Sequence, residues 1–102
     1  MALRTQPWTE NATDLAAPKE YAVILHNDDF TTMEFVVGIL IRIFHKTGQE
    51  AANIMMDVHN SGKAAAGAYT YDVAITKKIQ SEQLASQQGF PLRLTLEEII
   101  EG

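Results

Sequence analysis

The strongest constraint on the fold is the segment 32–46, which is apolar around most of its circumference if it is helical. Apolar residues such as Met33, Val36 and Leu40 recur at helical spacing, and Phe35 adds an apolar residue on the other side. A helix of this kind must be covered by other elements rather than lie on the surface. A chain of 102 residues can form one modest core that does so, and we therefore expect one folded domain.

Cap and turn signals divide the rest of this domain into elements. Thr31 and Glu34 have the capping-box spacing ahead of the first helix, and Thr47 and Glu50 repeat it ahead of the next. Gly62 is suited to the left-handed cap that ends this second helix. A small antiparallel sheet packed against helices is the economical architecture for such a chain. The predicted elements are a strand at 21–26, helices at 32–46 and 48–60, a strand at 63–69, a helix at 71–88 and a strand at 92–96.

The N-terminal residues 1–20 mix small, polar and proline residues without a period, so we expect a flexible extension there. Residues 21–102 then form the domain. Trp8, the one tryptophan, lies in the extension, where it either packs back on the domain or contacts a partner.

Composition argues against several classes of function. The net charge is −5 and no Lys/Arg cluster occurs, which argues against nucleic-acid binding. There is no cysteine, and the histidines lack metal-ligand spacing, so we expect no metal and no cofactor. No apolar stretch is long enough to span a bilayer and no signal peptide is evident, so we expect a cytoplasmic monomer without membrane contact. Without a visible nucleophile, catalytic base or phosphate loop, the chain is not expected to be an enzyme.

Two groups of residues indicate a binding site. Asn27, Asp28 and Asp29 lie between the first strand and the first helix, and Met55 and His59 are one turn apart on the second helix. Each group alone also fits a structural interpretation, namely a turn before a helix cap and a core stripe with one hydrogen-bonded histidine. Together they describe acceptors for an ammonium group beside an apolar pocket. The N-terminus of a peptide that begins with Leu, Phe, Tyr or Trp has this chemistry.

Four motifs, in order and at compatible spacing over roughly residues 20–98, resemble the ClpS adaptor family. The first, NDDFTTMEFV at 27–36, resembles the family signature NDD-aromatic-T-x-M-E-F-V. The others are VH-x-x-GKA at 58–64, the glycine–aromatic–threonine step at 67–70, and Pro91-Leu92 with Thr95.

This resemblance implies a fold and a function. The implied fold is α/β, a three-stranded antiparallel sheet packed against three helices, as in the C-terminal domain of the ribosomal stalk protein. ClpS proteins recognise N-degrons, which are destabilising N-terminal residues, and deliver those substrates to a Clp AAA+ unfoldase (ClpA or ClpC) with the ClpP peptidase. They hydrolyse nothing themselves.

The resemblance also implies roles for individual residues. Met33 would be the gate that rejects β-branched first residues, and residues 1–20 would engage the unfoldase during delivery. The residues expected around the α-amino group are Asn27, Asp28, Asp29 and His59. The side-chain pocket is expected to be lined by Thr31, Met33, Val36, Met55, Val58 and Leu92. The N-terminal domain of the unfoldase is expected to contact Asp72 and Lys77.

Three positions depart from the family pattern. His26 stands where the family usually has an apolar residue at the pocket edge, Thr32 replaces a frequent proline, and Ile75 stands where the family often has glutamate. Two alternatives to the adaptor stay open: a ClpS-like modulator that binds the unfoldase but has a weak degron pocket, and a small enzyme that acts on peptide N-termini.

Overall fold

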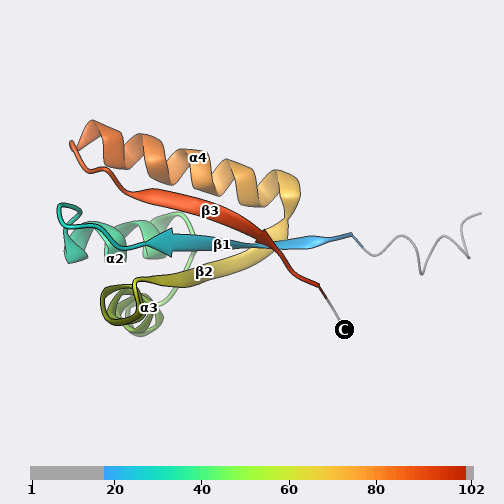
Figure 1. The fold of residues 1–102 in the computed structure, drawn as a ribbon, viewed down its shortest axis with the longest axis horizontal. Coiled ribbons are helices and arrows are strands. Elements are labelled where there is room, and N and C mark those ends of the chain that lie inside the picture. The colour runs from blue at the N-terminus through green and yellow to red at the C-terminus, as the bar shows by residue number, and fades with distance from the viewer. Residues whose placement is uncertain (1–17, 101–102) are drawn as a thin grey trace, which may run out of the picture.

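The computed structural model describes residues 18–100, which form three strands and three helices (Figure 1). The predicted three-stranded antiparallel sheet packed against three helices is confirmed. The strand order is β2-β1-β3, so that β1 is the central strand. The elements are β1 (Glu20–His26), α2 (Met33–Arg42), α3 (Gly48–Ser61), β2 (Lys63–Thr70), α4 (Tyr71–Gln87) and β3 (Arg93–Glu98).

Alternation along β1 determines where the core lies. Val23 and Leu25 are fully buried and belong to the main core, and Leu25 pairs with Leu94 on β3. Because neighbouring side chains on a strand point to opposite faces, Ile24 lies on the other face of the sheet. The helices contribute Ile39 and Leu40 of α2 to the core, together with residues of α3 and α4.

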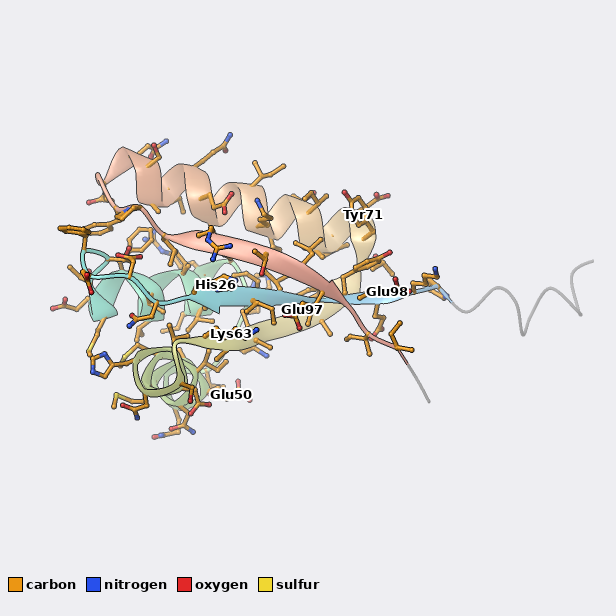
Figure 2. All side chains as sticks on the ribbon, viewed as in Figure 1. His26, Glu50, Lys63, Tyr71, Glu97 and Glu98 are labelled. Carbon is orange, nitrogen blue, oxygen red and sulfur yellow. The ribbon has the colours of Figure 1, made fainter. Side chains whose placement is uncertain are left out.

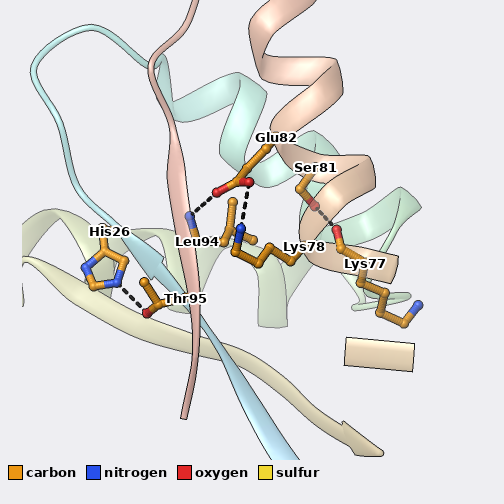
Figure 3. Close-up of polar contacts among 7 residues, drawn as sticks. All are labelled: His26, Lys77, Lys78, Ser81, Glu82, Leu94 and Thr95. Carbon is orange, nitrogen blue, oxygen red and sulfur yellow. Dashed lines mark hydrogen bonds and ion pairs between the residues drawn. The ribbon is translucent and has the colours of Figure 1, made fainter. Parts of the chain in front are cut away.

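A carboxylate on α4 ties this helix to the edge of the sheet (Figure 3). Glu82 accepts the backbone N–H of Leu94 at 2.9 Å through Oε2, and its Oε1 accepts the Lys78 ammonium at 2.9 Å. The Leu94 N–H lies on an edge strand, where it would otherwise need water or another chain as a partner. Glu82 therefore holds α4 in place and satisfies part of the exposed edge of β3.

The second predicted capping box and the glycine cap of α3 are both confirmed. Thr47 accepts the N–H of Glu50 through its side chain, and the Glu50 carboxylate accepts the N–H of Thr47 in return. Gly62 has φ 91° and donates its N–H to the carbonyl of Val58. The two ends of α3 are thus determined by residues within one turn of each end.

The predicted capping box at the start of α2 is wrong. The N-cap is Thr32, whose hydroxyl oxygen accepts the N–H of Phe35 at 3.1 Å. Thr31 lies one residue before the N-cap, and its hydroxyl donates to the carboxylate of Asp28. The helix therefore begins one residue later than the spacing predicted, with Thr32 in the role expected of Thr31.

The C-terminal end of α2 also differs from the prediction, since the helix ends at Arg42 rather than Lys46. The carbonyl of Ile43 accepts a hydrogen bond from the Lys77 ammonium of α4, and His45 has the left-handed value φ 57°. The N–H of Lys46 donates to the carbonyl of Leu40 across this left-handed residue, so the backbone of residues 40–46 closes the helix, and Lys77 satisfies the Ile43 carbonyl.

The boundaries of the sheet differ slightly from those predicted. β1 begins at Glu20, which pairs with Thr70, and β3 begins at Arg93, so that Leu92 precedes the strand. Residues 1–17 of the predicted extension, including Trp8, lie outside the described residues. Over residues 18–100, no helix is both long and apolar enough to cross a membrane.

Candidate functional site

The loop between β1 and α2 is organised by the carboxylate of Asp28. Its Oδ1 accepts the backbone N–H groups of Phe30 at 2.8 Å and Thr31 at 2.7 Å, and its Oδ2 accepts the Thr31 hydroxyl at 2.7 Å. Partial burial raises the pKa of Asp28, but these hydrogen bonds outweigh it and leave the pKa below its ordinary value. The carboxylate therefore stays charged and holds the loop in one shape.

The end of α3 is joined to this loop through the backbone. The N–H of Asn27 donates to the carbonyl of Gly62 at 2.9 Å. Because Gly62 is the C-cap of α3, this bond places the last turns of the helix beside residues 27–31. Met55 and His59 are four residues apart on α3 and so share one face of the helix.

A cavity of about 290 Å³ lies between the loop, the start of α2 and the end of α3. Nine of the ten residues predicted for the α-amino site and the side-chain pocket line it. Val36 and Val58 are buried, whereas Met33 is 43% exposed. The lining residues are Asn27, Asp28, Asp29, Thr31, Met33, Val36, Met55, Val58 and His59.

The cavity has a polar part with an unbalanced negative charge and an apolar part beside it. Asp28 and Asp29 form no ion pair with any residue in the range 18–100. Carboxylate, amide and imidazole groups can accept hydrogen bonds from an ammonium group, which would supply the missing positive charge. The valine and methionine side chains offer an apolar surface at the same site. Such a cavity is suited to a ligand that carries a cation next to an apolar group.

Leu92 is the predicted pocket residue that does not line this cavity. It is 6% exposed and belongs to the main core, directly before β3. The motif around Pro91 matched in sequence, but the path of the chain into β3 determines where this side chain points.

His26, which the resemblance places at the pocket edge, does not line the cavity of about 290 Å³. The side chain lies on the outer face of the sheet, where Nε2 is 2.7 Å from Oγ1 of Thr95 (Figure 3). Partial burial and the neighbouring charges of Arg93 and Lys63 lower the pKa of His26, and Glu97 opposes them. Lys63 and Glu97 themselves form an ion pair at 3.5 Å on two strands that flank β1 (Figure 2). His26 therefore takes no part in the lining of the cavity.

The two residues predicted to contact an unfoldase line a second, larger cavity. This groove of about 840 Å³ lies between α4 and the end of α2, and Arg42 and His45 also line it. Asp72 is exposed in the first turn of α4. Lys77, in contrast, is half-buried and donates to the carbonyl of Ile43.

The Lys77 ammonium also lies close to two neighbouring aromatic rings. It is 5.2 Å from the ring centroid of Tyr69 and 5.8 Å from that of Phe44. Sequence reasoning missed this internal role because the partners are distant along the chain. It also missed the role of Asp28 in holding the loop, although an Asp followed by a Thr three residues later is a recognisable local signal for such a turn. Within residues 18–100, no cluster of three or more His, Cys, Asp or Glu residues could hold a metal ion.

Comparison with known proteins agrees with this arrangement. The family model described as "ATP-dependent Clp protease adaptor protein ClpS" matches residues 16–95. The ClpS adapter protein of Acetivibrio thermocellus is 48% identical over 95% of this chain and 98% of its own length. The adapter of Lawsonia intracellularis is 54% identical over 82% of this chain and 77% of its own length.

A solved structure extends the likeness to three dimensions. Agrobacterium tumefaciens ClpS2 bound to L-phenylalaninamide superposes with a TM-score of 0.77 at 36% sequence identity. The match covers 80% of this chain and 99% of that one. Family model, relatives and fold agree, and the chain therefore belongs to the ClpS family of ATP-dependent Clp protease adaptor proteins.

Proposed function

We propose that this chain is an adaptor for N-degrons. It binds proteins whose first residue is Leu, Phe, Tyr or Trp and delivers them to a Clp AAA+ unfoldase and the ClpP peptidase. The single observation that carries this proposal is the cavity in which acidic, amide and imidazole side chains adjoin an apolar floor. A free α-ammonium group next to a large apolar side chain complements both parts of that cavity.

The energetics are consistent with a useful affinity. Each hydrogen bond between the ammonium and a charged or polar acceptor contributes about 1.5–3 kcal/mol. Burial of a large apolar side chain adds about 4–6 kcal/mol, for about 150–250 Å² at about 25 cal/mol per Å². The costs of association reduce this sum to about −8 kcal/mol, which corresponds to a micromolar dissociation constant.

The ligand in the Agrobacterium tumefaciens structure supports the same chemistry. L-Phenylalaninamide carries an ammonium group beside a phenyl ring, and the protein that binds it is 36% identical to this chain. The cavity of about 290 Å³ is at the lower end of small-molecule sites, so it suits one side chain and its α-amino group. In this proposal Asn27, Asp29 and His59 accept from the ammonium, with Asp28 beside them.

Met33 is proposed as the gate of the pocket. It is the first residue of α2, and its side chain is 43% exposed although it lines the cavity. A side chain at this position can narrow the entrance. First residues such as Val and Ile, which branch at Cβ, would collide with it because their extra carbon lies near the α-amino group.

The proposed partner is the N-terminal domain of a Clp unfoldase, ClpA or ClpC. The groove between α4 and α2 is separate from the degron cavity, so substrate and unfoldase can bind at the same time. Asp72 is exposed there and free to contact a partner, whereas Lys77 contributes through the shape of the groove. The N-terminal extension 1–20 is proposed to engage the unfoldase during delivery. No catalytic step is proposed for this chain.

The test is fluorescence anisotropy with labelled peptides that differ only in the first residue. We expect micromolar binding to Leu-, Phe-, Tyr- and Trp-peptides, and loss of binding when the α-amino group is acetylated. Binding that ignores acetylation would refute the ammonium site. Binding to the unfoldase with no preference for any first residue would favour the modulator instead.

A further inference from the structure

Thr31 contributes both to the lining of the cavity and to the hydrogen bonds of the loop. It lines the cavity, and its hydroxyl donates to Oδ2 of Asp28 at 2.7 Å. On the basis of the proposed function, we infer that Thr31 is a positioning residue for the α-ammonium site. Its hydroxyl fixes the Asp28 carboxylate, which in turn orients Asn27 and Asp29, and the hydroxyl does not select among substrate side chains.

The hydrogen bonds of Asp28 support this division of roles. A carboxylate offers about four acceptor positions. Two backbone N–H groups and the Thr31 hydroxyl use three of these in the structure. Most of the acceptor capacity of Asp28 is therefore used within the loop, and little of it is left for a ligand.

The residues on either side of Asp28 are in the opposite situation. The side chains of Asn27 and Asp29 are exposed, and neither forms a side-chain hydrogen bond to another residue in the range 18–100. Both line the cavity. They are free to accept from an ammonium group, but nothing except the backbone of the loop holds them in place. The shape of the loop, which Asp28 maintains, therefore decides whether their acceptors converge.

The Thr31 hydroxyl has one proton, and this proton is donated to Asp28. The side chain therefore offers the cavity a methyl group and oxygen lone pairs, but no donor. Replacement by valine keeps the branched shape of the residue and removes only the hydroxyl. Replacement by serine keeps the hydroxyl and removes only the methyl group. This pair of variants separates positioning through Asp28 from contact with the substrate side chain.

The experiment measures dissociation constants of Thr31→Val, Thr31→Ser and the unchanged protein for Leu-, Phe-, Tyr- and Trp-peptides. We expect Thr31→Val to weaken binding by about 10-fold or more, the effect of one hydrogen bond to a charged group, by a similar factor for every peptide. Thr31→Ser should keep affinities within about 3-fold, which is under about 1 kcal/mol, because serine retains the hydroxyl that donates to Asp28. Circular dichroism establishes that both variants are folded.

A second measurement needs no peptide. Site-resolved NMR titration follows the Asp28 carboxyl separately from Asp29 and His59, the other titratable groups of the lining. In Thr31→Val the Asp28 pKa should move upward, and in Thr31→Ser it should stay in place.

Three results would overturn the inference. The first is that Thr31→Val binds all four peptides as tightly as the unchanged protein does. The second is that Thr31→Val alters the ranking of the four peptides with little change in their mean affinity, and the third is that the pKa of Asp28 does not move in this variant. If Thr31→Val fails to fold, Thr31→Ser decides, since a loss of affinity in spite of the retained hydroxyl would contradict positioning. Failure of the proposed function has a different signature. In that case the unchanged protein does not distinguish free from acetylated peptides, whereas the Asp28 titration still shifts in Thr31→Val.

Discussion

Replacing Lys77 with methionine should destabilise the domain, even though Lys77 was first identified as a partner contact. The ammonium donates to the Ile43 carbonyl at the end of α2 and lies against the rings of Phe44 and Tyr69. Methionine keeps an unbranched apolar stem and a similar helix propensity, so the change removes the ammonium and little else.

The size of the effect follows from these contacts. A hydrogen bond from a charged donor contributes about 1.5–3 kcal/mol, and a cation–π contact contributes about 0.5–2 kcal/mol. The contacts share one half-buried ammonium and do not add in full, so we expect a loss of about 2 kcal/mol in the free energy of unfolding. For a domain of this size, that corresponds to a decrease in Tm of about 8–16 °C.

The assay is urea and thermal unfolding followed by circular dichroism, with Lys78→Met as the matched control. Lys78 is the neighbouring lysine on α4, and it forms a partly exposed i,i+4 ion pair with Glu82. Such pairs contribute about 0.3–0.5 kcal/mol, so the control should lower Tm by about 1–4 °C. Equal effects of the two substitutions, or a loss under about 0.5 kcal/mol for Lys77→Met, would refute the structural role of Lys77. Loss of unfoldase binding in a Lys77 variant must therefore be compared with its stability.

Four further outcomes are expected. Asp28→Ala combined with Asp29→Ala should abolish degron binding in a folded domain, because the ammonium loses Asp29 as an acceptor and the loop loses the carboxylate that holds it; retained affinity would exclude this site. Met33→Ala should admit Ile- and Val-peptides in the anisotropy assay, and continued rejection would show that Met33 is not the gate. Gly62→Ala should cost about 1–2 kcal/mol because φ is 91°, whereas Gly48→Ala should be neutral or stabilising, since a Cβ there meets nothing within 4 Å. Because the pKa of Asp28 is lowered in the folded state, its contribution to stability is present above the unfolded pKa of about 3.9 and is lost as pH falls through the folded value. Urea unfolding at decreasing pH should show this loss of stability, and an equal loss in Asp28→Asn would contradict the role of Asp28.

Much of the candidate site could be predicted from the sequence because its residues occupy two short segments. Residues 27–36 supply the loop and the start of α2, and residues 55–59 supply one face of α3. Within each segment the spacing alone predicts which side chains lie together, since neighbours on one face of a helix are three or four residues apart. The meeting of the two segments followed from the resemblance, and in the structure the Asn27–Gly62 hydrogen bond brings it about.

The points at which the structure differs from the sequence prediction have other physical causes. Thr31 and Thr32 are neighbours that can both cap a helix, and the structure uses Thr32, while Thr31 donates its hydroxyl to Asp28. The carbonyl of Ile43, the C-cap of α2, is satisfied by Lys77, which lies 34 residues further along the chain. Leu92 is directed into the core by the path into β3. For Lys77 and Leu92 the contacts come from distant parts of the chain, whereas the contact between Asp28 and Thr31 spans only three residues.

The sequence by itself therefore determined the order of the elements, the caps of α3 and the chemical character of the site. Those features depend on hydrogen bonds within about four residues and on the burial of apolar residues at a fixed period, both of which can be read along the chain. Only the tertiary structure decided which lysine binds the Ile43 carbonyl at the end of α2, and that His26 lies on the outer face of the sheet. These features depend on competition between polar groups for partners, and that competition is resolved only when distant elements pack together.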